Sequence, residues 1–277
     1  MKIFEILKVV LVGIVEGITE WLPISSTGHL IIIEEYIDVS SIFLGGKDFW
    51  DIFLVAVQLG AVMAVVTCNF SKFNIFNGIK EEKKGSWLLW AKVIVACLPA
   101  AFIGLLFGDY LDEKFYNYLT VAAMLIVYGI IFMVIKFNNQ KIKFNRVEDI
   151  SFSRAFLIGL FQVLALIPGT SRSGVTILGA MFLFCSKDVA CEFSFFLAVP
   201  VMVGASLIKF VKYFVSYDLF FSDLCLLFIG MIVAYVVSLV VIKWLLRYIK
   251  SNDFRLFGVY RIILGIILIL IKIFKWC

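Results

Sequence analysis

Long apolar runs, separated by short polar segments, make up most of the chain. A helix that crosses a lipid bilayer needs about 20 predominantly apolar residues. Six stretches satisfy this requirement and predict transmembrane helices: 49–68, 87–108, 118–136, 190–211, 223–246 and 256–274. The pattern therefore predicts an all-α polytopic membrane protein.

Two further apolar regions, residues 3–36 and 153–185, are each broken near the middle by Pro, Gly and hydroxyl residues. The breaks read WLPISSTGH (Trp21 to His29) and LIPGTSRSGVT (Leu166 to Thr176), and the apolar pieces beside them are mostly too short to span a bilayer alone. We expect two re-entrant units, each a helix, a loop and a helix that returns to the same side. Irregular backbone at membrane depth is tolerated where it lines a wet cavity, so both loops should line one.

The two broken regions also resemble each other. A set of polar and glycine positions recurs at a constant spacing of 146: Gly13, Glu16, Ser25, Thr27 and Gly28 match Gly159, Gln162, Ser171, Ser173 and Gly174. This repeat divides a single integral membrane domain, residues 1–277, into pseudo-repeats over about 1–136 and 153–277. With the loop orientation given below, the first unit enters from outside and the second from the cytoplasm, so we expect inverted repeats that meet near the midplane, as in many transporters.

Charged residues between the apolar runs indicate how the chain is oriented across the membrane. Lys and Arg concentrate within 72–84, 136–154 and 247–255, which predicts that these loops are cytoplasmic. The segments 109–116 and 216–223 are mainly acidic and suit the outer face, where both termini and the opening of the cavity between the two breaks are then expected.

Composition excludes a soluble globular fold, because 63% of the residues are hydrophobic and 16% are charged, against about 25% charged in typical soluble domains. The net charge of +5 is small, and we expect no nucleic-acid partner.

The six cysteines lie mostly in apolar runs without a CxxC pair and are interpreted as small buried residues. Acidic residues interrupt the first apolar run, so we expect this segment to be retained rather than cleaved as a signal peptide.

Glu16 and Glu20 are four residues apart, so on a helix they share one face. Ionisable side chains within a membrane are costly and usually face a cavity or a partner. Two carboxylates at this spacing can bind Mg²⁺ or Ca²⁺, with water and substrate phosphates completing the coordination shell. The alternative is a pair of solvated acids near a helix end.

Three hydroxyls and the only histidine follow Pro23, namely Ser25, Ser26, Thr27 and His29. The hydroxyls can cap the next helix, and a helix N-terminus also attracts anions, so capping and phosphate binding are compatible. His29 is the one histidine available for proton transfer near neutral pH, although a lone histidine is often structural.

The second break supplies Arg172, whose planar guanidinium suits phosphate oxygens, between two glycines that permit tight turns. Arg172 could instead form a salt bridge to Glu16 or Glu20 that joins the two halves, and such a bridge is compatible with substrate binding. Together the motifs offer a cation clamp, a metal site, a nucleophile and a proton carrier, which are the parts that phosphoryl transfer needs. Other polar residues in apolar runs are expected at helix contacts or interfaces: Gln58, Lys92, Gln162 and Glu192.

The sequences EGITEWLPISSTGH (Glu16 to His29) and PGTSRSGVT (Pro168 to Thr176) resemble the undecaprenyl diphosphate phosphatases of the bacitracin-resistance (BacA/UppP) type. The resemblance extends over the whole chain in length and number of segments. It implies a multi-pass hydrolase of the bacterial plasma membrane that removes one phosphate from undecaprenyl diphosphate. It further implies that the enzyme recycles the lipid carrier for peptidoglycan synthesis and confers bacitracin resistance; a homodimer is compatible with it.

The resemblance also implies roles for individual residues. Glu16 and Glu20 correspond to the metal and acid–base carboxylates, Ser26 and His29 to the nucleophile and its proton-transfer partner, and Arg172 to the diphosphate clamp. Hydroxyl and backbone donors would complete the phosphate shell at Ser25, Thr27, Ser171, Ser173 and Thr176. Ser26, His29 and a metal-activated water are all chemically able to attack phosphorus, and we favour Ser26.

Three other classes of function share some of these features. Inverted repeats with broken helices also predict a transporter, for example a polyprenyl-phosphate flippase, which would need a similar lipid groove. A membrane acid phosphatase that uses separate histidines as nucleophile and acid is excluded by a single histidine. A non-catalytic scaffold would not need Arg, Glu and His together at two breaks.

Overall fold

The computed structural model describes residues 2–69, 80–135 and 142–276, and within these ranges it is helical, with one isolated β-bridge between Phe144 and Cys185. The first half contains α1 (Ile3–Thr19), α2 (Ser26–Ile37), α3 (Gly46–Cys68), α5 (Lys80–Phe115) and α6 (Tyr118–Val134). The second contains α7 (Phe152–Val163), α8 (Arg172–Phe182), α9 (Lys187–Ser216), α10 (Phe221–Ser251) and α11 (Arg255–Trp276). Short 3₁₀ turns lie at Ser40–Ile42, Val147–Asp149 and Leu164–Leu166.

Five helices of the described chain are long and apolar enough to cross a membrane: α3, α5 from Gly85 onward, α9, α10 and α11. The predicted spans 49–68, 87–108, 190–211, 223–246 and 256–274 fall within them. The stretch 118–136 contains α6, which is apolar but has only 17 residues. The chain is therefore a multi-pass membrane protein. Three basic residues used to orient the loops, Lys72, Lys136 and Lys141, lie outside the described residues.

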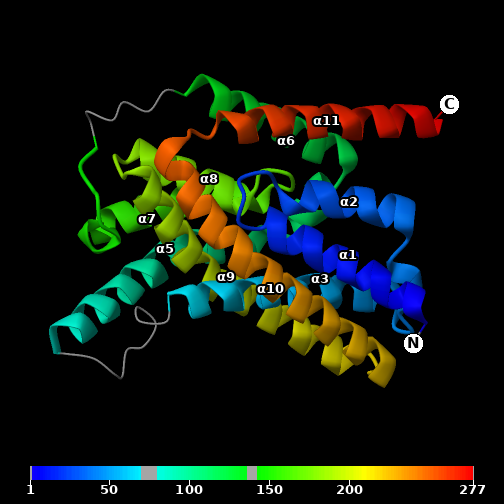
Figure 1. The fold of residues 1–277 in the computed structure, drawn as a ribbon. Helices are drawn as coiled ribbons and strands as arrows, with labels where there is room; N and C mark the ends of the chain where they lie inside the picture. Colours follow the sequence, from blue (N-terminus) through cyan, green and yellow to red (C-terminus); the bar gives the residue numbers. More distant parts are fainter. Residues whose placement is uncertain (1, 70–79, 136–141, 277) are drawn as a thin grey trace.

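Each broken apolar region forms a helix–loop–helix hairpin, α1–α2 in the first half and α7–α8 in the second (Figure 1). The two hairpins extend toward opposite ends of the molecule, and their loops lie in its middle. The start of α1 and the end of α11 lie at the same end. Both motifs therefore lie in and directly beside these loops, at the centre of a bundle of long apolar helices.

The two halves share unusual backbone conformations at corresponding positions. Outside glycine, positive φ angles in the described chain occur at Ser25 (71°) and Ser171 (72°), and at Asp38 (48°) and Phe184 (68°). The members of each pair are 146 residues apart, the spacing of the sequence repeat. Non-glycine residues rarely adopt such angles, so a coincidence of two pairs is improbable for unrelated segments.

The hairpins interlock the two halves, because α1 packs on α10 of the second half and α7 packs on α5 of the first. Glycine allows both contacts to be close. A Cβ atom on Gly13 would lie 2.9 Å from the Gly230 carbonyl oxygen, and one on Gly159 would lie 2.2 Å from the Ala96 carbonyl oxygen. Each hairpin is thus held mainly by a helix of the opposite half.

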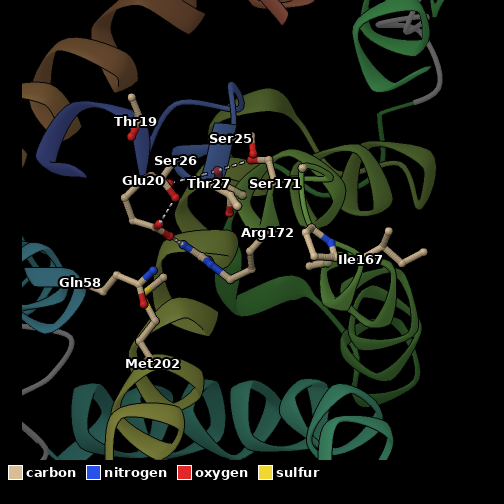
Figure 2. Close-up of a pocket in the computed structure, with 14 residues that line it drawn as sticks. Thr19, Glu20, Ser25, Ser26, Thr27, Gln58, Ile167, Ser171, Arg172 and Met202 are labelled. Atoms are coloured by element: carbon tan, nitrogen blue, oxygen red, sulfur yellow. Dashed lines mark hydrogen bonds and ion pairs between the residues drawn. The ribbon is translucent and has the colours of Figure 1, made fainter. Parts of the chain in front are cut away.

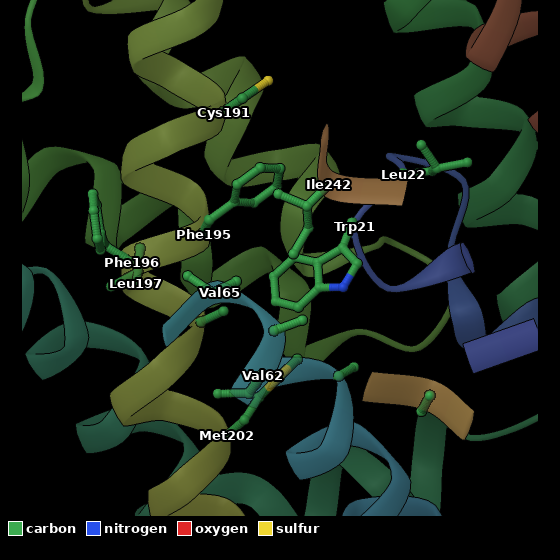
Figure 3. Close-up of a cluster of buried hydrophobic side chains, with 14 of the residues drawn as sticks. Trp21, Leu22, Val62, Val65, Cys191, Phe195, Phe196, Leu197, Met202 and Ile242 are labelled. Atoms are coloured by element: carbon green, nitrogen blue, oxygen red, sulfur yellow. The ribbon is translucent and has the colours of Figure 1, made fainter. Parts of the chain in front are cut away.

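Trp21 anchors the first loop in the apolar core (Figure 3). Its side chain is fully buried, and its ring meets Phe195 of α9 edge-on, with 5.2 Å between ring centroids. Ile242 of α10 and Val65 of α3 belong to the same cluster. Packing against α3, α9 and α10 therefore fixes the position of Trp21, which directly follows Glu20.

Candidate active site

A polar cavity of about 180 Å³ lies between the two loops (Figure 2). The end of α1, the first loop and the start of α2 supply Thr19, Glu20, Ser25, Ser26 and Thr27. The second hairpin contributes Ala165, Ile167, Pro168, Gly169, Ser171, Arg172 and Ser173, while Gln58 of α3 and Met202 of α9 close the remaining wall. The cavity therefore draws its polar groups from both motifs.

Arg172 and Glu20 form an ion pair across this cavity. The Arg172 Nη2 donates to Glu20 Oε1 at 3.0 Å, and Nη1 donates to the Ser194 carbonyl oxygen at 2.8 Å. The side chains are 11% and 6% exposed, so both charges are largely withdrawn from solvent. Removing one partner of such a buried pair strongly destabilises the folded protein, because the other charge is left buried and unpaired. Of the two acids considered as partners of Arg172, Glu20 forms the bridge.

Ser26 shares the same carboxylate, because its hydroxyl donates to Glu20 Oε2 at 3.3 Å (Figure 2). One oxygen of Glu20 thus faces the arginine and the other faces the serine. A carboxylate in this position can accept the serine proton while the guanidinium faces an incoming anion.

Hydroxyls of the second loop tie it to the first. The Ser173 hydroxyl lies 3.1 Å from the Glu20 carbonyl oxygen and 3.2 Å from that of Leu22, and it also lies 3.2 Å from the Ser171 hydroxyl. Ser171 caps α8 by accepting from the Gly174 amide at 3.2 Å. The positive end of α8 is therefore directed at the cavity, as expected of an anion site.

Thr176 does not line the cavity. Its hydroxyl is buried, donates to the Arg172 carbonyl oxygen at 2.8 Å and contacts the Ser194 hydroxyl at 2.6 Å. The Ser194 carbonyl oxygen also accepts a hydrogen bond from the Arg172 side chain. Thr176 therefore helps to hold Arg172 in place, both directly and through Ser194.

His29 also lies outside the cavity lining. Its Nδ1 is 2.8 Å from the Ser25 carbonyl oxygen, and its Nε2 is 2.7 Å from the Tyr260 hydroxyl, with the two rings stacked. If Nδ1 carries the proton, Nε2 accepts from Tyr260. The structure therefore engages both ring nitrogens away from the Ser26 hydroxyl.

Glu16 lies one turn before Glu20, and the Glu20 amide donates to its carbonyl at 3.0 Å. It is 1% exposed, and neither carboxylate oxygen has a hydrogen-bond partner. No group of three or more His, Cys, Asp or Glu residues in the described chain gathers into a metal site. A divalent cation held by Glu16 and Glu20, with the rest of its shell from water and phosphate, fits the oxygen chemistry of Mg²⁺ or Ca²⁺ and would satisfy the orphaned carboxylate.

Two residues of α11 join the site although they lie outside both motifs. Tyr260 holds His29, and Arg261 donates to backbone carbonyls of both loops. The available signal for Arg261 was its position as a charged residue inside the apolar run 256–274. Gln58, expected at a helix contact or an interface, lines the cavity.

Comparison with known proteins agrees with these motifs. The family model described as "Bacitracin resistance protein BacA" matches residues 9–267. The chain is 55% identical over 267 residues to the "Undecaprenyl-diphosphatase" of Enterococcus faecalis, covering 95% of each chain. It is 52% identical to the protein of that name from Acetivibrio thermocellus over 96% of this chain and 97% of the relative, and 50% identical to that from Streptococcus mutans over 99% of each. A family model that matches nearly the whole chain, together with relatives at this identity, assigns the chain to the bacitracin resistance protein BacA family.

Proposed function

We propose that this chain hydrolyses undecaprenyl diphosphate to undecaprenyl phosphate and inorganic phosphate. This activity returns the lipid carrier to peptidoglycan and cell-wall synthesis and confers bacitracin resistance. The observation that carries the proposal is the Glu20 carboxylate, shared by Arg172 and Ser26 on a polar cavity among apolar helices. The names of the relatives support the same substrate.

The residues around the cavity suit an in-line transfer of the terminal phosphoryl group. The planar guanidinium of Arg172 donates hydrogen bonds to phosphate oxygens of the substrate, and these bonds replace its bond to Glu20. The Ser26 oxygen attacks the terminal phosphorus as Glu20 accepts the hydroxyl proton, and the bond from that phosphorus to the bridging oxygen breaks, which releases undecaprenyl phosphate. Water then cleaves the phosphoserine, and Glu20 returns a proton to the serine oxygen as inorganic phosphate leaves.

Two alternatives for the attacking atom are His29 and a water molecule. The bonds of His29 to Ser25 and Tyr260 favour Ser26 over His29. Ser25, Thr27, Ser171 and Ser173 would complete the phosphate shell with hydroxyl and amide donors. Thr176, the remaining member of the expected set, would act through Arg172 because its hydroxyl is committed to the carbonyl of that residue.

A divalent cation forms part of the proposal. Glu16 and Glu20 would hold it, and Glu20 is also the carboxylate that contacts Ser26 and Arg172. When bound, Mg²⁺ or Ca²⁺ supplies Lewis-acid stabilisation of negative charge on phosphate oxygens.

The proposed membrane arrangement has six transmembrane helices, with α6 as the sixth, and two re-entrant hairpins related as inverted repeats. The opposed hairpins and the matching positive φ angles support it. We further propose that the protein resides in the bacterial plasma membrane with its cavity open to the outer face, as the acidic segments 109–116 and 216–223 suggest. A homodimer is compatible with this arrangement.

Phosphate release by the purified protein from undecaprenyl diphosphate in detergent, with and without EDTA, tests the proposal. We expect release that is lost in EDTA and restored by Mg²⁺ or Ca²⁺. Release that is insensitive to EDTA would remove the cation from the mechanism and leave the enzyme activity intact. No release under either condition would refute the phosphatase and favour a transporter.

A further inference from the structure

Arg261 of α11 lies outside the cavity lining and contacts the main chain of both loops. Its side chain is completely buried. Nη1 donates to the Pro23 carbonyl oxygen at 3.1 Å, and Nη2 donates to those of Gly169 and Thr170 at 2.9 Å each. A longer bond of 3.4 Å reaches the Met124 carbonyl in α6. One guanidinium therefore joins the first break, the second break and the helix that packs beside α11.

Among the described residues, no carboxylate forms an ion pair that balances the charge of Arg261. In the part of the chain that the structure describes, no salt bridge involves this residue. A charged side chain inside an apolar bundle is costly, and here only carbonyl dipoles and the face of Tyr128, 5.6 Å from the guanidinium carbon, compensate for it. An apolar residue would fill this space at lower cost, so the fork of donors is the feature that distinguishes arginine here.

The loop carbonyls that Arg261 contacts belong to the one or two residues that precede each of two strained serines. Pro23 lies two residues before Ser25, and Gly169 and Thr170 immediately precede Ser171. Ser25 and Ser171 have φ angles of 71° and 72°, a conformation that costs a non-glycine residue about 1–3 kcal/mol and persists only where its surroundings over-determine it. The donors of Arg261 fix the peptide planes before both turns.

The residues that follow the strained serines are Ser26 and Arg172, the proposed nucleophile and the proposed phosphate clamp. We infer that Arg261 is a positioning residue: its planar fork holds the two loops in register, so that the Ser26 oxygen faces the phosphorus of a diphosphate bound by Arg172. This inference rests on the proposed phosphatase function. A lysine would retain the charge, but its compact ammonium cannot span carbonyls of two loops with the same geometry.

The test compares Arg261→Lys with the unsubstituted full-length protein, using steady-state release of phosphate from undecaprenyl diphosphate in detergent. We expect kcat to fall about 10- to 100-fold, because a misplacement of about 1 Å can cost 100-fold. KM should change less than about threefold, since Arg172 and the hydroxyls of the second loop remain. The matched control is Arg255→Lys on the same helix, whose side chain is 51% exposed and should leave both constants unchanged.

The outcomes separate the inference from the function on which it rests. An inactive unsubstituted protein would overturn the phosphatase and the inference together. An active protein whose Arg261→Lys variant keeps its kcat would overturn the inference alone. A variant with lower melting temperature and a proportional loss of active protein, but unchanged kcat per active site, would likewise overturn it and leave Arg261 a structural residue.

If Arg261→Lys does not fold, Gly174→Ala provides the same test without removing the arginine. A Cβ atom there would lie 3.3 Å from Arg261 Nη1 and from the Ser171 hydroxyl oxygen, which forces a shift of a few tenths of an ångström. We expect kcat to fall at least about threefold with KM retained. Gly108→Ala, which meets nothing within 4 Å, is the control. A normal kcat in folded Gly174→Ala would overturn the inference.

Discussion

Replacing Arg172 by lysine keeps the positive charge of the cavity and removes its planar fork. In the structure the two terminal nitrogens of Arg172 have separate tasks, one on Glu20 at 3.0 Å and one on the Ser194 carbonyl at 2.8 Å. A lysine ammonium at the end of a differently shaped side chain can satisfy only one of these geometries. The same limitation would apply to a bound diphosphate, for which the fork offers two parallel donors.

The size of the effect follows from the bond that is lost. A hydrogen bond to a charged group contributes about 1.5–3 kcal/mol. At about 1.4 kcal/mol for each factor of ten in rate, losing one such bond to the transition state lowers kcat/KM about 10- to 150-fold. The ion pair with Glu20 is retained in weakened form, so the variant should remain folded, with a lower melting temperature in detergent.

The assay is the release of phosphate from undecaprenyl diphosphate by purified variants, with kcat and KM determined separately. Arg146→Lys makes the same chemical change at a side chain that is 76% exposed and pairs with Glu148 at 3.7 Å, so it should behave as the unsubstituted protein. Activity of Arg172→Lys within about threefold of the control would refute the two-donor clamp.

Three further predictions follow from individual contacts. Ser26→Ala should abolish turnover while the folded protein still binds the lipid in a pull-down with labelled substrate, whereas near-normal phosphate release would exclude Ser26 as nucleophile. Tyr260→Phe removes a bond worth about 0.5–1.5 kcal/mol from His29, so kcat should fall by no more than about tenfold; a complete loss would give Tyr260 a larger role. Gly159→Ala places a Cβ atom 2.2 Å from the Ala96 carbonyl oxygen and should destabilise the fold by about 1–3 kcal/mol, seen as a lower melting temperature in detergent; an unchanged value would contradict the close contact of α5 and α7.

The apolar runs and the two polar breaks were sufficient to predict the helical membrane fold and the motifs that meet at the cavity. The meeting of Arg172 with Glu20 could be anticipated because a buried charge needs a partner. The length of α6 was less predictable, since its 17 residues end before the stretch 118–136 does.

The contributions of α11 could not be read from the motifs. Arg261 reaches main-chain carbonyls, which carry no residue-specific signal, and its partners at Pro23 and Gly169 are 238 and 92 residues away. His29 is a similar case, because its place beside Tyr260 depends on how α2 packs against α11. Side-chain chemistry identified candidate groups, and only tertiary packing separated those that line the cavity from those behind it.

The separation of 152 residues between Glu20 and Arg172 has a consequence for biosynthesis. At a synthesis rate of about 5–20 residues per second, the ribosome needs roughly 8–30 s to reach the arginine after it has made the acid. During that interval the Glu20 carboxylate lacks the guanidinium that pairs with it, so we expect the first hairpin to remain at the aqueous surface and to pack between the long helices only after the second hairpin has emerged. In a chain whose native cysteines are replaced, labelling of Ser26→Cys in nascent chains stopped before and after Arg172 would reveal this order: both chains would be protected equally if the first hairpin inserted on its own.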